Sequence, residues 1–256
     1  VFVLDKVTMA EANDSAFLIA KLTSQPFAPV ILTLANNDPT ECTLPSTITL
    51  NETDWQSGVG ITILSVDDDL DDEAQLCTIQ TTAVRSDNDY HALAIAETKV
   101  TVQDDETAGF AITPTTIAVS EPNSTATFAV ALTSEPTATV TISLTSQDES
   151  ECTGAAPLIL DATNWQTGVT ATIQAQDDRM DDGAQPCPLT LLAHSADGDY
   201  DGQSMTAATA TVADDDTAGV IVTPEHLTVQ EPAGAAIFTI TLTSEPTAPV
   251  TVDLHS

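Results

Sequence analysis

The sequence predicts an all-β protein made of tandem immunoglobulin-like sandwiches, with seven strands in each repeat of about 110 residues. Short runs rich in Val, Ile and Thr alternate between apolar and polar residues, as half-buried strands do. The breaks between them hold Pro, Gly, Asp and Ser, and no stretch has the periodicity of a helix. About seven such runs fall in each repeat, which is typical of two packed antiparallel sheets.

The second repeat shows the strand pattern most clearly. Phe128, Val130 and Leu132 share one face of a run, with Thr and Ala on the other face. Pro114 lies early in the first run, where an edge position or a break between two sheets would tolerate it. The expected strands are Phe110–Val119, Thr125–Leu132, Thr139–Thr145, Leu158–Leu160, Val169–Ala175, Leu189–Ala196 and Ala207–Ala213.

Internal repetition sets the domain organisation. Trp55 and Trp165 are separated by the same length of chain as Tyr90 and Tyr200. The segment LTSQPFAPV recurs as LTSEPTATV and LTSEPTAPV, and DDETAG recurs as DDDTAG, always at that same offset and without a gap. This register predicts one repeat at residues 1–108, a second at 109–218, and a partial third at 219–256 that holds only the first strands. A third of a domain cannot bury a core, so we expect a longer array.

The charge balance narrows the class of partner. The chain has 39 acidic residues against 5 Lys and Arg, a formal net charge of -34. Nucleic acid is excluded as a natural partner because its phosphates need basic residues, and an anionic membrane surface is disfavoured for the same reason. No apolar run is long enough to insert into a membrane. Clustered carboxylates favour a multivalent cation, and a merely acidic, soluble surface is the alternative.

Four cysteines allow three pairings, and the repeat favours one of them. Cys42–Cys77 and Cys152–Cys187 are the disulfides that let each repeat fold alone. Each would close a loop of about 35 residues and contribute roughly 3–4 kcal/mol in the chain-entropy model. Buried thiols or a shared metal are the alternatives, although no CxxC spacing supports zinc. Disulfides place the chain in an oxidising compartment, which predicts an extracellular or cell-surface location.

Three Asn-X-Ser/Thr triplets are candidate N-glycosylation sites, at Asn13, Asn51 and Asn123. Asn13 and Asn123 occupy the same position of the repeat. Such triplets also arise by chance in a chain rich in Ser and Thr, so turn residues are the alternative.

Three acidic features recur in register. The first is a glutamate at the end of the first strand, found as Glu11, Glu121 and Glu231. The second is the run DDDLDDE from Asp67, matched by DDRMDD from Asp177, and the third is DDE from Asp104, matched by DDD from Asp214. Because strand ends and loops gather at the poles of a sandwich, the two runs can meet at one pole. Hard cations want six to eight oxygen ligands, which such carboxylates can supply.

The order of these motifs resembles that of the Calx-beta-like tandem repeats found in large bacterial extracellular and surface proteins. The resemblance lies in VSEP, LTSEPTATVTISL, NWQTGVTATI, AQDD, DGDY and VADDDTAG, and it covers the whole chain. It implies a seven-strand sandwich with Ca2+ bound at the tip where the repeat ends.

The resemblance also implies a set of calcium ligands. Arg179 replaces Asp69 and Gly183 replaces Glu73, so we expect fewer or weaker ions in the second repeat. Acidic runs beside strand ends also keep sandwiches from pairing edge to edge, which is the structural alternative. The implied ligands are Glu11, Asp67, Asp68, Asp71 or Asp72, Asp104, Asp105 and Glu106 in the first repeat, and Glu121, Asp177, Asp178, Asp181 or Asp182, Asp214, Asp215 and Asp216 in the second.

The favoured interpretation is a structural spacer of an exported repeat protein, an adhesin shaft or extracellular fibre stiffened by Ca2+. Its partners would be neighbouring repeats of the same chain, with other copies in a fibre as further candidates. An adhesive or carbohydrate-binding module is one alternative, and a calcium-responsive regulatory domain is another. No enzyme is expected, because neither a nucleophile elbow nor a phosphate-binding glycine loop occurs. Trp55, Trp165, Tyr90 and Tyr200 are expected to pack in or beside the core.

Overall fold

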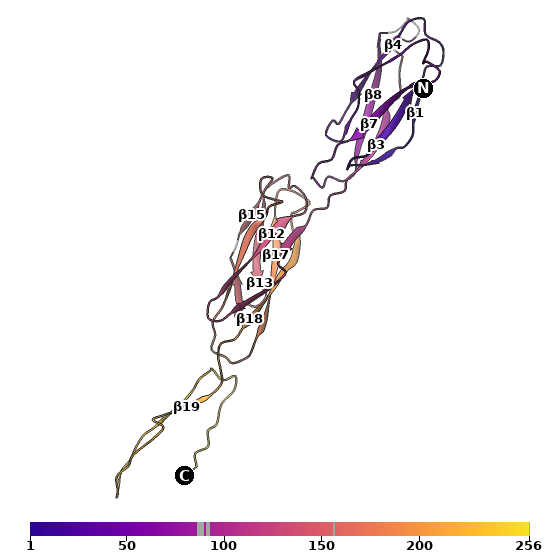
Figure 1. Cartoon of the computed structure of the whole chain (residues 1–256). Coiled ribbons are helices and arrows are strands. Elements are labelled where there is room, and N and C mark those ends of the chain that lie inside the picture. The colour runs from indigo at the N-terminus through magenta and orange to yellow at the C-terminus, as the bar shows by residue number, and fades with distance from the viewer. Residues whose placement is uncertain (86–89, 91–92, 156, 256) are drawn as a thin grey trace. The chain divides into compact units, whose positions relative to one another are not determined.

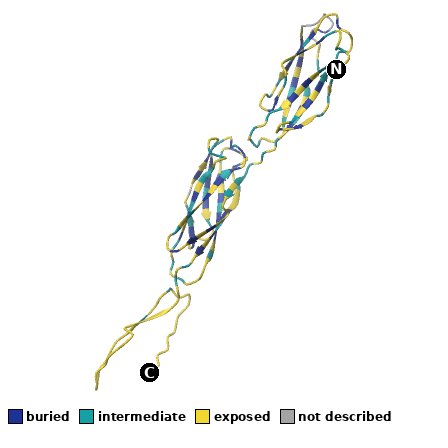
Figure 2. Cartoon of the chain, in the orientation of Figure 1, coloured by how far each residue is buried: buried dark blue, intermediate teal, exposed yellow. Residues whose placement is uncertain are grey.

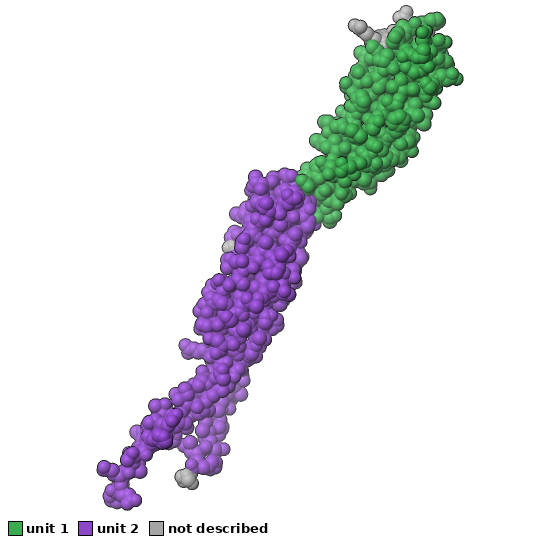
Figure 3. All heavy atoms as spheres, viewed as in Figure 1, with its two compact units in different colours: residues 1–107 green, residues 108–256 purple. Residues whose placement is uncertain are grey.

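The computed structural model describes residues 1–85, 90, 93–155 and 157–255. It divides the chain into two compact units, Val1–Thr107 and Ala108–Ser256 (Figure 3). Strands and turns make up both units (Figure 1). No helix long and apolar enough to cross a membrane occurs in the described part of the chain.

The first unit is a sandwich of two sheets. One sheet has the order β1-β3-β7-β5 and the other has the order β2-β9-β8-β4-β6. Neighbouring strands are antiparallel except β2 and β9, which are parallel. The strands are β1 Phe2–Leu4, β2 Thr8–Ala10, β3 Ser15–Ala20, β4 Val30–Asn36, β5 Cys42–Thr43, β6 Thr47–Leu50, β7 Val59–Ser65, β8 Gln75–Arg85 and β9 Thr98–Gln103.

The second unit repeats this topology strand for strand. Its sheets have the orders β10-β12-β16-β14 and β11-β18-β17-β13-β15, with β11 parallel to β18. The expected all-β fold of tandem sandwiches is therefore confirmed. The strands are β10 Phe110–Thr113, β11 Thr116–Ser120, β12 Thr125–Leu132, β13 Val140–Ser146, β14 Cys152–Gly154, β15 Leu158–Leu160, β16 Val169–Ala175, β17 Gln185–His194 and β18 Ser204–Ala213.

The strand count differs from the expected seven for two reasons. The first run breaks at Pro114, so that β10 joins one sheet and β11 the other. Proline has no N–H to donate to a ladder, which makes it a natural point for the chain to change sheets. The short strand β14 was not expected, and β17 begins at Gln185, ahead of the predicted start at Leu189.

The cores follow the alternation of the sequence (Figure 2). In β12, Phe128, Val130 and Leu132 are all buried, whereas Thr127 and Ala129 face solvent. The side chains that fill both cores are almost all aliphatic. This agrees with a composition of only 4% aromatic residues.

A buried tyrosine ties two loops together in each unit. The Tyr200 hydroxyl donates to the Ser134 carbonyl at 2.8 Å and accepts from the Ser134 N–H at 3.1 Å. Tyr90 makes the same pair of bonds with Ser24, at 2.7 and 3.2 Å. The Phe110 ring packs on Tyr200 at a centroid distance of 6.3 Å. These tyrosines are therefore packing residues, as expected.

Each unit has one disulfide between its two sheets. Cys42 of β5 is bonded to Cys77 of β8, and Cys152 of β14 to Cys187 of β17. The Cα atoms are 6.1 Å apart in both. The bonds therefore lie inside single repeats.

Residues 219–256 hold a two-stranded ladder, β19 Val220–Thr223 with β20 Thr239–Leu242. Its register, Val220 opposite Leu242, is that of Phe110 opposite Leu132 one repeat earlier. The apolar side chains of this segment lie open, and Ile237 is 87% exposed. The further division of the second unit into a whole repeat, 109–218, and a partial one, 219–256, stays a prediction.

Removal of one disulfide should weaken one unit alone. In a Cys152→Ala/Cys187→Ala variant, we expect the free energy of unfolding of the second unit to fall by roughly 3 kcal/mol, because the unfolded chain regains the freedom of a loop of about 35 residues. Urea denaturation followed by Trp165 fluorescence in a Trp55→Phe background would measure this. Trp55 fluorescence in a Trp165→Phe background is the control, and an equal shift of both transitions would contradict the prediction.

Candidate metal centres

The acidic residues meet at one pole of each unit because the second strand and the last strand of the sandwich run in parallel. β11 and β18 end side by side, with Ser120 opposite Ala213, so the next residues, Glu121 and Asp214, are neighbours. The Glu121 N–H donates to the Ala213 carbonyl at 3.0 Å. In the first unit, β2 and β9 place Glu11 beside Asp104 in the same way, through a 2.9 Å bond from the Glu11 N–H to the Gln103 carbonyl.

The glutamate at this junction is buried in both units. Glu11 is 3% exposed and Glu121 is 8% exposed. The Glu121 Oε2 atom is buried and has no hydrogen-bond partner among the described residues, and the same holds for Glu106 Oε2. A buried carboxylate oxygen without a partner is costly, and a bound cation would remove that cost. The residues therefore fit a metal ion.

An aspartate after the last strand clamps the loops that surround this glutamate. Asp214 Oδ2 accepts from the N–H groups of Asp182 and Gly183 at 3.1 and 2.8 Å, and its Oδ1 accepts from Asp216 at 2.7 Å. The Gly183 bond is the main reason that the pKa of Asp214 lies below its ordinary value. A carboxylate held by several N–H groups stays charged.

Asp104 repeats these bonds in the first unit. Its Oδ2 accepts from the N–H groups of Asp72 and Glu73 at 3.0 and 2.8 Å, and its Oδ1 accepts from Glu106 at 2.8 Å. The aspartate therefore fixes both the acidic loop and the terminal acidic run in both units.

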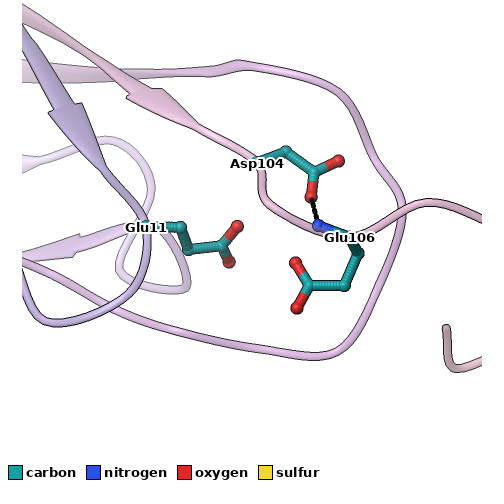
Figure 4. Close-up of side chains that lie close together, drawn as sticks. All are labelled: Glu11, Asp104 and Glu106. Atoms are coloured by element: carbon teal, nitrogen blue, oxygen red, sulfur yellow. Dashed lines mark hydrogen bonds between the residues drawn. The ribbon is translucent and has the colours of Figure 1, made fainter. Parts of the chain in front are cut away.

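The first unit has one group of three acids. Carboxylate oxygens of Glu11, Asp104 and Glu106 lie within 4.8 Å of one another. Figure 4 shows the carboxylates of Glu11 and Glu106 facing each other across a gap, with Asp104 held to the backbone of Glu106. The Asp68 N–H donates to Glu11 Oε1 at 3.1 Å and so brings the acidic loop to the same place.

Three groups of acids lie in the described part of the second unit, each within the same 4.8 Å limit, and two of them share Glu121. Glu121 belongs to two of them, one with Asp177 and Asp215, the other with Asp214 and Asp216. The third group joins Glu151, Asp178 and Asp182. More than one cation could therefore bind, and Glu121 would bridge two positions.

Burial raises the pKa values of three glutamates in these groups. Burial raises the pKa of Glu121 to about 7, and the negative charges of Asp178 and Asp214 add to the shift. Burial also raises the pKa of Glu11 to about 7, against the effect of the Asp68 hydrogen bond. Glu106 likewise has a pKa of about 7, mainly through burial. Bound cations must displace these protons, which makes affinity depend on pH.

Two further glutamates belong to the acidic poles, and the sequence reasoning missed them. Glu41 and Glu151 come directly before Cys42 and Cys152, and both are buried, at 4% and 7% exposed. Burial is the first cause that raises the pKa of each, followed by the charge of Asp72 or Asp182. The two glutamates are one full repeat apart, and that spacing was the signal that could have found them.

The structure separates the paired alternatives in the acidic loop. Asp182 lies in the group with Glu151, whereas Asp181 Oδ2 accepts from the Ala218 N–H at 2.6 Å. In the first unit, the described acids of the loop do not form a corresponding group of three. Asp67, Asp71, Asp72 and Asp105 therefore remain predicted ligands only. Asp68 contributes its N–H to Glu11.

The three candidate glycosylation sites lie in turns. Asn13 and Asn123 are exposed and have positive φ values of 54° and 63°, a conformation that asparagine tolerates better than most residues. Asn51 is half-buried, and its Oδ1 accepts from the Thr53 N–H at 2.9 Å, a bond that Asp161 makes to Thr163 in the second unit. Both conformations suit turn residues, and modification stays a prediction.

No protein-family model matches the chain, and no curated protein matches it either. Among solved structures it is similar to the calcium-binding domain CBD12 of CALX1.1, with 13% identity, a TM-score of 0.36, and coverage of 83% of this chain and 99% of that one. CBD12 from CALX1.2 gives 10% identity, a TM-score of 0.34, and coverage of 82% and 98%.

Domains 4 and 5 of the S-layer protein SbsC give 11% identity, a TM-score of 0.32, and coverage of 71% of this chain and 76% of that one. The expected resemblance to Calx-beta domains is thus present as a structural similarity. At these scores it carries no argument about ligands, and the site rests on the geometry above.

Substitution of Glu121 should weaken cation binding in the second unit. Because Glu121 belongs to two acidic groups, we expect Glu121→Gln to lower Ca2+ affinity there by at least about tenfold from the 10⁻⁴–10⁻³ M dissociation constants typical of extracellular modules. Calorimetric titration would measure it, with Glu149→Gln, an exposed glutamate of the neighbouring loop, as the matched control. Equal affinities for the two variants would contradict the assignment.

The stability of the metal-free protein should fall as pH rises. The folded pKa of Glu121 is about 7, above its ordinary value of 4.5, so the folded state holds the proton more tightly than the unfolded state. The associated stability is present below about pH 4.5 and is lost as pH rises through about 7.

Thermal unfolding in EDTA between pH 4.5 and 8 would measure this loss. Glu121→Gln should flatten the pH dependence for the second unit, whereas Glu149→Gln should not. A wild-type protein whose melting temperature does not fall over this range would rule the assignment out.

Proposed function

We propose that the chain is a structural spacer of an exported repeat protein, a segment of a stalk, adhesin shaft or extracellular fibre whose modules bind Ca2+ at their acidic poles. One observation carries the proposal. The same sandwich occurs twice. In each copy a buried glutamate lies beside the end of the last strand, where the chain continues into the next repeat. A single binding function would not need the copy.

The ligand atoms favour calcium over other metals. All the candidate ligands are carboxylate oxygens, and neither His nor Cys joins the acidic groups of the described residues. Oxygen ligands select hard cations. The second unit gathers eight acids in three groups, Glu121, Glu151, Asp177, Asp178, Asp182, Asp214, Asp215 and Asp216, a crowded and irregular set that suits the flexible coordination of Ca2+ better than the octahedral shell of Mg2+.

The build of each unit supports a load-carrying role outside the cell. All four cysteines form disulfides between the two sheets, and such bonds persist in oxidising compartments. The net charge of -34 keeps chains apart in solution. Divalent cations would neutralise part of that charge at the poles, where neighbouring repeats of the same chain follow one another.

A cavity in the first unit bears on the alternative of a binding module. The first unit has a cavity of about 530 Å³ with an apolar lining that includes Leu18, Leu32 and Ile95, and Lys21 and Lys99 also line it. The last strand of the first unit is shorter than that of the second. β9 starts at Thr98, the counterpart of Ala208, whereas β18 already starts at Ser204. An apolar lining offers few partners for a sugar, so the cavity does not support carbohydrate binding.

Calcium should make the chain longer and stiffer in solution. We expect small-angle scattering of residues 1–256 to give a larger radius of gyration in millimolar Ca2+ than in EDTA, because bound cations would fix the acidic loops at the poles and so limit bending between modules. A Glu11→Gln/Glu121→Gln variant should respond less. Identical scattering in Ca2+ and EDTA would count against calcium stiffening, while an extended shape in both would leave the spacer role standing.

A further inference from the structure

The acidic loop of the second repeat also contacts the segment that begins the third. The loop comprises residues 177–183, and two hydrogen bonds join it to residues 217–245, while a third lies within that segment. Asp181 Oδ2 accepts from the Ala218 N–H, and the Arg179 carbonyl accepts from the Glu245 N–H, both at 2.6 Å. The Thr243 hydroxyl donates to the Thr217 carbonyl at 2.6 Å. A hollow of about 430 Å³ lies beside this contact, lined by Asp181, Val220 and Leu242 among others.

Residues of the recurring LTSEP segment take part in these and related contacts. Leu132 is buried in the core, and the Thr133 N–H donates to the Gly109 carbonyl at 3.1 Å, as Thr243 does to Gly219 at 3.0 Å. Ser134 binds the buried tyrosine of its own module. The fourth residue, Glu245 in the third copy, donates its N–H to the preceding module's loop.

The two tasks of the loop fall on different residues. Asp178 and Asp182 lie with Glu151, in one of the acidic groups of the pole. Asp181 and the carbonyl of Arg179 instead accept bonds from residues 218 and 245. Asp214 binds the N–H groups of Asp182 and Gly183 and so fixes the loop between the two.

We infer that loop 177–183 is the docking surface for the N-terminal pole of the following module, held by the Asp181–Ala218 and Arg179–Glu245 hydrogen bonds without any metal. The partner is the linker TAG and the loop LTSEP of the next repeat. This inference rests on the proposed function, because it names the groups that join one module of the spacer to the next. Asp181 positions the linker at this joint, whereas Asp182 is a candidate cation ligand.

Two isosteric variants of adjacent residues test whether Asp181 holds the following module and Asp182 binds the cation. In ¹⁵N-labelled chain 1–256 in EDTA, Asp181→Asn should speed amide exchange at Ala218 by at least about fivefold, because a bond to a charged acceptor is weakened. Asp182→Asn should leave that rate unchanged in EDTA. In Ca2+ titrations the order reverses, so that Asp182→Asn weakens binding whereas Asp181→Asn stays within about twofold of wild type.

The core amide of Ala210 in β18 is the internal control and should keep its protection in both variants. Ala218→Pro removes the same bond from the donor side, and it should speed exchange at Glu245 as much as Asp181→Asn does. Unchanged exchange at Ala218 in Asp181→Asn, equal acceleration by Asp182→Asn, or loss of protection at Ala210 would each overturn the inference. Because the exchange is measured in EDTA, absence of calcium binding would defeat the proposed cation sites and leave this result intact.

Discussion

The parallel pairing of the second and last strands of each sandwich determines what its acidic pole can do. Antiparallel neighbours would send the chain ends to opposite poles, whereas β11 and β18 end together and set Glu121 beside Asp214. The backbone of Glu121 is bonded to β18, so its side chain is held at the junction and is buried there. The pair β2 and β9 imposes the same geometry on Glu11 and Asp104. The gathering of these acids at one pole is therefore a consequence of the topology.

The acids at a pole differ in role, although their charges are alike. The Asp214 carboxylate accepts hydrogen bonds from three backbone N–H groups and so holds the surrounding loops in place. Glu121 has a buried oxygen without a partner among the described residues, so it has a free lone pair to offer. Asp181 is turned toward the linker. Such differences arise from which donors face each carboxylate, and no count of charges would reveal them.

Much of this arrangement could be predicted from the gapless internal repeat, including the fold class and most of the acids at the poles. Other features depended on neighbours that are distant in sequence. Glu151 is a single acid beside a cysteine, and only the folding of β14 against β16 brings it to Asp178 and Asp182. The strand expected from Leu189 begins instead at Gln185, so that β17 includes Pro186 and Pro188, which have no N–H to donate to a ladder. Asp181 and Asp182 are adjacent and chemically identical, so only their directions in space distinguish them.

The disulfides also set how far a module can stretch under tension. Cys152 and Cys187 are separated by 35 positions in the chain, and the bond closes the segment between them into a loop. If a pulled spacer lost its fold, that loop would stay closed and would withhold roughly 120 Å of contour length at about 3.4 Å per residue. A shaft of such modules would yield in short steps and reach its limit early. In such a spacer, the covalent cross-link would limit how far each module extends.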